Sequence, residues 1–121
     1  MIKLEEIGIE NAVAFHVAGK ITESDMDMAF AEMKEKIRLH TNIVLYEQID
    51  SFGGVELAGI IDKFKYLFDM GISNITKVAI VTDKAWIEKI VTLEDKIFRR
   101  IEMKVFSIDD KALAIEFLRE Q

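Results

Sequence analysis

Two carboxylates, Glu47 and Asp50, are the residues of this chain whose type and spacing come closest to acid–base chemistry. Paired acids can divide the roles of proton donor and proton acceptor when their surroundings separate their pKa values. Such a site also needs a nearby histidine, a nucleophilic serine or a set of metal ligands, and this stretch supplies none of them. The sequence therefore predicts a protein that is not an enzyme, with catalysis by these two acids as the weakest alternative.

A glycine pair, Gly53-Gly54, follows the two acids. Missing side chains at a helix start could let an anion approach backbone N–H groups. However, no lysine and no serine or threonine follows at the spacing of a phosphate-binding loop, and there is no GxGxxG pattern. We interpret the pair as a tight strand-to-helix turn, with an anion nest as the alternative.

Metal and cofactor sites find little support in the sequence. The chain has no cysteine, and its two histidines, His16 and His40, are far apart. His16 lies within an expected strand, where a histidine satisfied in the core or at an interface is the common case, and His40 lies at an expected helix C-terminus, where the dipole favours a cation. The sequence predicts no metal and no cofactor.

An aromatic helix is the sharper candidate for a binding site. Trp86 begins an apolar stripe that polar residues at 92 and 94–96 interrupt before it resumes at 97–98. A helical apolar stripe usually packs into a core. The interruption favours a second interpretation, in which a helix over residues 84–98 moves and uncovers an apolar crevice.

The elements that would position these residues alternate along the chain. Hydrophobic patterning predicts strands at 2–7, 12–19, 42–46, 77–82 and 103–108, and helices at 23–39, 55–70, 84–98 and from Asp109, with Leu113, Phe117 and Leu118 of the last helix facing inward. A turn at 8–11 favours an antiparallel hairpin, and the later alternation predicts parallel crossovers. We expect an α/β fold with a mixed, mostly parallel five-stranded sheet and four helices. Its ligand crevice should lie beyond the carboxyl ends of the strands, near residues 47–56.

Composition narrows the class of protein. The 121 residues fit a single domain spanning 1–121, and 50% hydrophobic with 31% charged residues is typical of globular chains. A net charge of −6 disfavours nucleic-acid binding. No window is apolar enough for a signal peptide or a membrane span, so we expect a cytoplasmic protein, with peripheral membrane contact as a variant.

Several motifs together carry a family resemblance. They are Phe52-Gly53-Gly54, the strand at 77–81 leading through Asp83 to Trp86, Val105-Phe106, and the closing segment 112–118. Their order and spacing resemble the SpoIIAA-like family of the STAS superfamily, whose architecture in turn is similar to that of SEC14-type lipid carriers. The resemblance spans nearly the whole chain and implies the same α/β fold and a binding role.

One departure from the family pattern concerns regulation. Anti-sigma factor antagonists of this superfamily carry a phosphorylatable serine where the second helix begins, and the corresponding stretch here begins at Gly53. Ser51 precedes the glycines, so switching by phosphorylation is not expected. Glu56 could supply a fixed negative charge at the helix start, although an ordinary first-turn acid is the simpler interpretation.

These observations lead to two functional hypotheses. The first is a non-enzymatic SpoIIAA-like module that binds an apolar small molecule or lipid in a crevice gated by the helix at 84–98. Its ligand and gate residues are Trp86, Ile87, Ile90, Val91, Phe52, Gly53 and Gly54. The alternative is a protein-interaction module whose partner surface comprises Ser51, Gly54 and Glu56. Generous apolar content favours a homodimer under either hypothesis.

Overall fold

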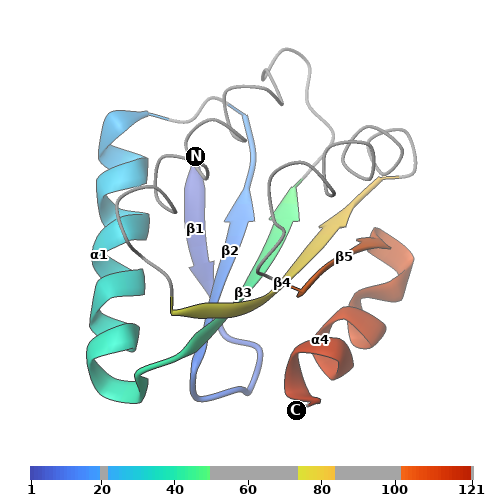
Figure 1. Cartoon of the computed structure of the whole chain (residues 1–121). Helices are drawn as coiled ribbons and strands as arrows, with labels where there is room; N and C mark the ends of the chain where they lie inside the picture. Colours follow the sequence, from blue (N-terminus) through green and yellow to red (C-terminus); the bar gives the residue numbers. More distant parts are fainter. Residues whose placement is uncertain (20–21, 50–73, 84–101, 121) are drawn as a thin grey trace.

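A computed structural model describes residues 1–19, 22–49, 74–83 and 102–120 of the chain. These residues form a twisted sheet with one helix on each side (Figure 1). In chain order the elements are β1 (Ile2–Glu5), β2 (Ala12–Val17), α1 (Glu23–His40), β3 (Ile43–Ile49), β4 (Ile75–Thr82), β5 (Glu102–Ser107), a 3₁₀ turn η1 (Ile108–Asp110) and α4 (Lys111–Arg119). The α/β class is confirmed.

The five strands follow one another across the sheet in sequence order. Strand β1 pairs antiparallel with β2, whereas the pairs β2–β3, β3–β4 and β4–β5 are all parallel. In Figure 1 the arrowheads of β2, β3 and β4 therefore reach the same upper edge, while β1 runs the other way. This confirms the predicted hairpin followed by a mostly parallel sheet.

The helix count is confirmed in part. The described residues contain two α-helices, α1 and α4, and one 3₁₀ turn. The two other helices predicted from the sequence, at 55–70 and 84–98, lie outside the described residues. Helix α1 begins at residue 23 as predicted and extends one residue past the predicted end.

Two details of the last helix differ from the sequence prediction. Asp109 is not its cap: the Ser107 hydroxyl accepts a hydrogen bond from the Asp109 N–H at 3.3 Å, and the 3₁₀ turn comes first. Leu113 does not face inward but is 59% exposed. The inward stripe consists of Ala114, Phe117 and Leu118, and the residue before Ala114 points about 100° away from that stripe.

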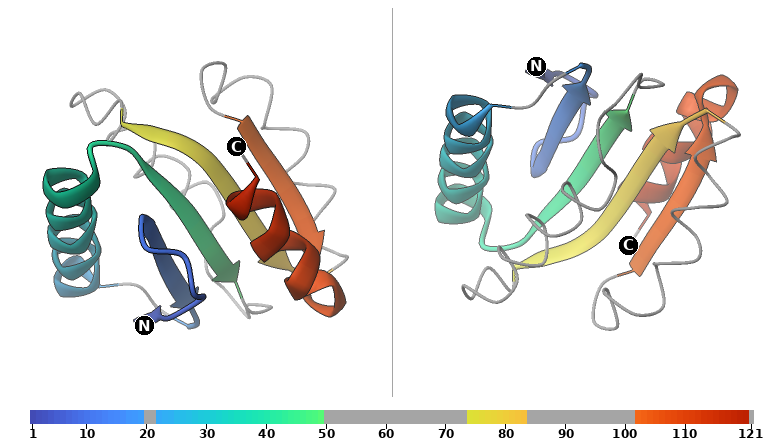
Figure 2. Two further views of the ribbon diagram at one scale, coloured as in Figure 1. Left: turned by 90° about the horizontal axis from the view of Figure 1, so that it is seen from below. Right: turned by 90° about the horizontal axis from the view of Figure 1, so that it is seen from above.

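The core lies in two layers, one on each side of the sheet. Figure 2 shows α1 and α4 on opposite sides of the sheet. On the α1 side, Ala29 and Met33 belong to one buried cluster with alternate residues of all five strands. On the α4 side, the inward stripe of α4 packs against the other set of alternate residues, including Tyr46 and Val81. Burial on both sides explains why β3 and β4 read as nearly continuous apolar runs.

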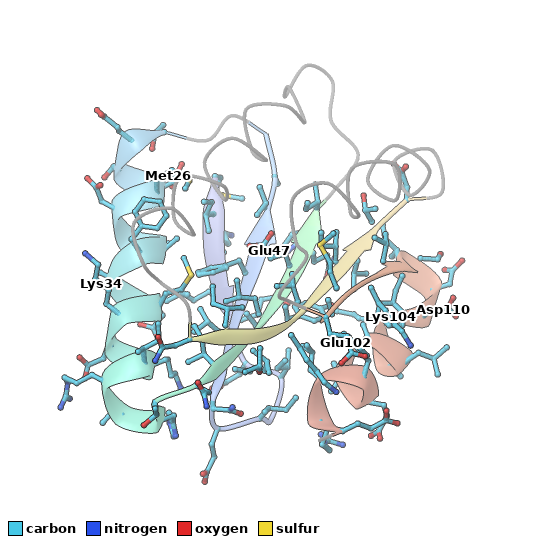
Figure 3. The ribbon with its side chains drawn as sticks, viewed as in Figure 1. Met26, Lys34, Glu47, Glu102, Lys104 and Asp110 are labelled. Atoms are coloured by element: carbon cyan, nitrogen blue, oxygen red, sulfur yellow. The ribbon has the colours of Figure 1, made fainter. Side chains whose placement is uncertain are left out.

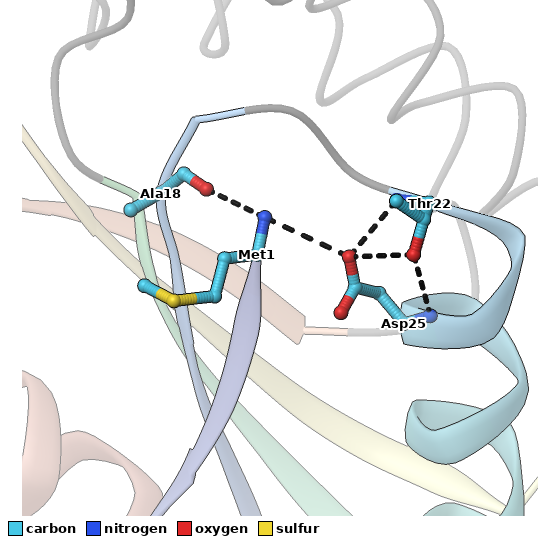
Figure 4. A network of polar contacts seen from close by, with 4 residues as sticks. All are labelled: Met1, Ala18, Thr22 and Asp25. Atoms are coloured by element: carbon cyan, nitrogen blue, oxygen red, sulfur yellow. Dashed lines mark hydrogen bonds and ion pairs between the residues drawn. The ribbon is translucent and has the colours of Figure 1, made fainter.

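The start of α1 is fixed by a capping box, for which Thr22 and Asp25 have the expected residue types and spacing (Figure 4). The Asp25 N–H donates to the Thr22 hydroxyl at 3.1 Å, and the Thr22 N–H donates to Asp25 Oδ2 at 2.9 Å. That backbone hydrogen bond is the main reason that the pKa of Asp25 is lowered. The amino group of Met1 lies 3.7 Å from the same carboxylate and donates to the Ala18 carbonyl at 2.7 Å. The cap thus ties the start of β1 and the end of β2 to α1.

The end of α4 is held by a lysine from the sheet. Lys77 Nζ on β4 donates to the carbonyls of Phe117 and Glu120, at 2.9 and 2.6 Å, and lies 4.8 Å from the centre of the Phe117 ring. A cation satisfies the free carbonyls at a helix C-terminus and complements its dipole. Lys77 therefore fixes α4 against β4.

Candidate functional site

The carboxyl ends of the parallel strands meet at one edge of the sheet, as the sequence predicts. Strands β2, β3, β4 and β5 end there at Val17, Ile49, Thr82 and Ser107. The N-terminus of α1 lies beside the same edge, since α1 follows β2 directly (Figure 1). In open α/β sheets this edge is where ligands bind.

Glu47 lies close to this edge but not in a loop. Strand β3 continues to Ile49, so the strand predicted at 42–46 ends too early and Glu47 belongs to the sheet (Figure 3). The hydrophobic pattern breaks at this glutamate, which made the strand look shorter than it is. Glu47 lies two residues from both Leu45 and Ile49, so its side chain points to the same face of the strand as theirs. That face is the α1 side of the sheet.

The surroundings of Glu47 are apolar. Its partner across β2 is Phe15 and its partner across β4 is Ile80. The residue is 3% exposed. Burial raises the pKa of Glu47 to about 8, so the carboxyl group is mainly protonated at neutral pH.

This environment sets the protonation state of one member of the predicted acid–base pair. A protonated carboxyl group cannot accept a proton as a general base, and it is available as a hydrogen-bond donor instead. Asp50, the second acid of the predicted pair, lies outside the described residues. At neutral pH Glu47 is therefore a donor of a hydrogen bond or of a proton, and its role in the predicted pair stays a prediction.

Thr82 is a buried polar residue on the same side that the sequence did not single out. It is fully buried at the end of β4, and its hydroxyl donates to the Ile49 carbonyl at 2.9 Å. That hydrogen bond joins the ends of β3 and β4 next to Glu47. The hydroxyl group of Thr82 therefore has its hydrogen-bond acceptor within the sheet, and this bond holds the ends of β3 and β4 together.

A polar cluster on the α4 side comes from four separate elements. His16 Nδ1 lies 3.3 Å from Glu5 Oε1, Lys111 Nζ lies 4.0 Å from Glu5 Oε2, and the Tyr46 hydroxyl donates to Gln48 Oε1 at 3.4 Å. Burial, together with the charge of Glu5, raises the pKa of Tyr46 to about 12. Sequence reasoning could not assemble this cluster, since its members lie on β1, β2, β3 and α4. His16 is a paired histidine, as predicted, but its side chain is 30% exposed and so not in the core.

A pocket of about 370 Å³ opens at the other end of β2, between β1 and the second half of α1. Its lining comprises Leu4, Glu5, Glu6, Ala12, Val13, Ala14, Glu32 and Lys36. Several carboxylates and an ammonium group line it, so it does not match the apolar crevice predicted at the carboxyl edge. Within the described residues, no group of three or more histidines or acids is arranged to hold a metal ion.

Comparison with known proteins gives the family. The SpoIIAA-like family model matches residues 12–119, which is nearly the whole chain. The chain belongs to the SpoIIAA-like family. No curated protein and no solved structure matches it significantly.

Several residues predicted for this SpoIIAA-like domain cannot be placed. The predicted gate and ligand residues, the partner surface and the second acid lie outside the described residues: Trp86, Ile87, Ile90, Val91, Phe52, Gly53, Gly54, Ser51, Glu56 and Asp50. They remain predictions. None of the helices in the described part has the length and apolar character needed to cross a membrane.

Proposed function

We propose that this SpoIIAA-like domain is a non-enzymatic module that binds an apolar small molecule or a lipid on the α1 side of its sheet, near the carboxyl edge. The observation that carries this proposal is the continuous cluster of buried apolar side chains on that side, which begins at Ile2 on β1 and reaches Met103 on β5. Glu47 adds a single acidic group to this cluster near the edge where α/β sheets bind ligands.

The apolar cluster extends beyond α1. Helix α1 packs mainly against β1, β2 and β3, whereas the cluster also includes Val78 and Ile80 on β4 and Met103 on β5, which are buried. Three methionines of α1, Met26, Met28 and Met33, belong to the same cluster. Methionine side chains are flexible and polarisable, so they can repack around ligands of different shape. This combination favours an adaptable apolar site.

A direct titration tests the proposal. The purified chain is expected to bind cis-parinaric acid, a fluorescent fatty acid, with saturation near one equivalent per chain. Trp86→Asp should weaken this binding about tenfold if the helix predicted at 84–98 closes over the site, because a charge would enter an apolar contact. Leu113→Asp is the matched control: Leu113 is 59% exposed on α4, so affinity should stay within twofold. Flat titrations with fatty acids, phospholipids and detergents would count against the proposal.

Membership of the SpoIIAA-like family supports a second candidate, a protein-interaction module that uses Ser51, Gly54 and Glu56. This candidate predicts that immobilised protein retains a protein partner from a lysate of its source organism and that Gly54→Arg abolishes the retention. Apolar probes would then bind weakly or not at all. Retention that is equal on the wild type and on Gly54→Arg would argue against this surface.

A further inference from the structure

Strand β1 forms one edge of the sheet. It stands at the end of the strand order (Figure 1), and within the described ranges of the chain it pairs with β2 alone. The edge of a sheet offers a row of backbone N–H and carbonyl groups to another strand. The apolar composition predicts a homodimer without indicating which surface forms it. Strand β1 is a candidate for that surface.

The backbone of β1 presents Leu4 to this edge. The Ala18 N–H donates to the Met1 carbonyl at 2.9 Å, so these two residues form a hydrogen-bonded pair of the β1–β2 ladder. In an antiparallel ladder every second residue forms such a pair, and the next ones on β1 are Lys3 and Glu5. The N–H and carbonyl groups of Leu4 therefore point away from β2, toward the edge.

The side chains of β1 divide between the two faces of the sheet. Leu4 lies opposite Phe15 and therefore on the α1 side, where it is 47% exposed. Its two neighbours, Lys3 and Glu5, point to the α4 side. Lys3 is exposed, and the side chain of Glu5 is 26% exposed. An exposed leucine between a lysine and a glutamate is a pattern that can complement itself.

Two copies of β1 complement each other when they pair antiparallel about a two-fold axis at Leu4. The two Leu4 residues then exchange backbone hydrogen bonds, and Lys3 of each copy faces Glu5 of the other. Opposite charges across two strands stabilise the pair, whereas like charges directly opposite each other destabilise it. Moving the axis by one residue would set Lys3 against Lys3 or Glu5 against Glu5. The charges of β1 therefore select one register.

We propose that β1 is the dimer interface of this protein, where two copies of the chain join edge to edge about a two-fold axis at Leu4 and form one continuous sheet. A two-fold contact uses the same surface on both copies, so assembly stops at two chains. The inference goes beyond the proposed function, because this interface needs no ligand.

The α1 helices leave room for this contact. Helix α1 packs against β1, β2 and β3 and is therefore centred over β2. Across the joined edge, the two β2 strands are three strand spacings apart, which is about 14 Å. Packed helices need only about 8–10 Å between their axes. The two α1 helices thus lie side by side without a clash, and the Leu4 side chains lie between them.

Charge reversal tests the register. Sedimentation velocity from micromolar to millimolar concentration should show that the wild type is a dimer. Lys3→Glu and Glu5→Lys should each raise the dissociation constant by about tenfold or more, because each sets like charges face to face and the two-fold axis doubles the effect. An equimolar mixture of the two variants should restore the dimer, since each chain then supplies the charge that the other lacks.

Lys34→Glu is the matched control for the change in net charge. Lys34 is an exposed residue of α1. It lies two residues from both Glu32 and Lys36, which line the pocket beside β1, so it points to the opposite side of the helix. The dissociation constant of this variant should stay within twofold of the wild-type value.

Cross-linking gives a second readout of the same register. The chain has no cysteine. The Cα atoms of a hydrogen-bonded antiparallel pair are about 5.5 Å apart, which suits a disulfide. With diamide as the oxidant, Leu4→Cys should form a disulfide-linked dimer. Leu113→Cys is the control: Leu113 is also exposed, at 59%, but lies on α4, so this variant should stay a monomer in denaturing electrophoresis.

Three results would each overturn the proposal. They are a wild type that is monomeric at every concentration, a dimer whose dissociation constant Lys3→Glu leaves unchanged, and a dimer that Leu4→Cys does not cross-link. Glu5 also contacts His16 and Lys111 within its own chain. Circular dichroism therefore checks that Glu5→Lys is folded, and Lys3→Glu and Leu4→Cys decide the question without it.

Discussion

Replacing Glu47 with glutamine is expected to stabilise the folded protein at neutral pH by about 3 kcal/mol, with no gain at pH 4. The ordinary pKa of the glutamate is 4.5, and burial raises it to about 8 in the fold. Between these values the unfolded chain has lost the proton and the folded chain keeps it. The wild type therefore loses stability as the pH rises from about 4.5 to 8, at about 1.4 kcal/mol per unit. Above pH 8 both states are ionised and the loss ends.

The measurement is urea unfolding of both proteins from pH 4 to 9, followed by circular dichroism. The difference in the free energy of unfolding isolates Glu47, because every other titrating group is shared. Glu102→Gln is the matched control, since Glu102 is an exposed residue on β5 and its replacement should leave the difference flat and within about 0.5 kcal/mol. A flat difference for Glu47→Gln as well would mean that the acid is ionised in the fold, with a charge partner that offsets its burial.

The sheet could be predicted from the sequence because its signals are local. The apolar run at 77–81 and the capping box at Thr22 and Asp25 each depend on residues near one another in the chain, and both appear as expected. The parallel order of β2 to β5 follows from the alternation of elements and from the preference for right-handed crossovers. Where the prediction of the last helix cap failed, two local capping signals competed. Ser107 caps a 3₁₀ turn that precedes α4, so Asp109 is not the cap.

The candidate site was less accessible to sequence reasoning. Glu47 drew attention as one of a pair of acids, which suggested chemistry in a loop. Its position inside β3 depends on pairing with Phe15 and Ile80, which lie more than thirty residues away in either direction. The strand pattern itself held a signal: Glu47 is in phase with Leu45 and Ile49, so extending the alternation by one step would have placed it on the buried side.

A buried acid that costs stability at neutral pH connects the stability of the fold with the candidate site. Proteins tolerate such groups chiefly at functional sites, where the group acts in binding or chemistry. A ligand that binds the fold and not the unfolded chain stabilises the protein by mass action, so a ligand of the proposed site should recover part of the lost stability.

Phe15→Ala is expected to show how strongly the apolar wall controls Glu47. Phe15 is 2% exposed and lies opposite Glu47 in the register of β2 and β3. Removing a buried aromatic ring costs about 3–5 kcal/mol. The space left beside a carboxyl group is polar enough to admit water, which would solvate the carboxylate. The pKa of Glu47 should therefore fall from about 8 toward its ordinary value of 4.5.

Phe117→Ala separates this local effect from general loosening of the fold. Phe117 is 7% exposed and packs on the α4 side, so its removal should cost a similar free energy of unfolding and leave the pKa of Glu47 unchanged. Urea unfolding gives the stabilities, and carbon-13 NMR titration of the glutamate side-chain carboxyl groups gives the pKa. Equal pKa shifts in the two variants would mean that Glu47 responds to overall loosening of the fold. A shift confined to Phe15→Ala would place the cause in the apolar contact between β2 and β3.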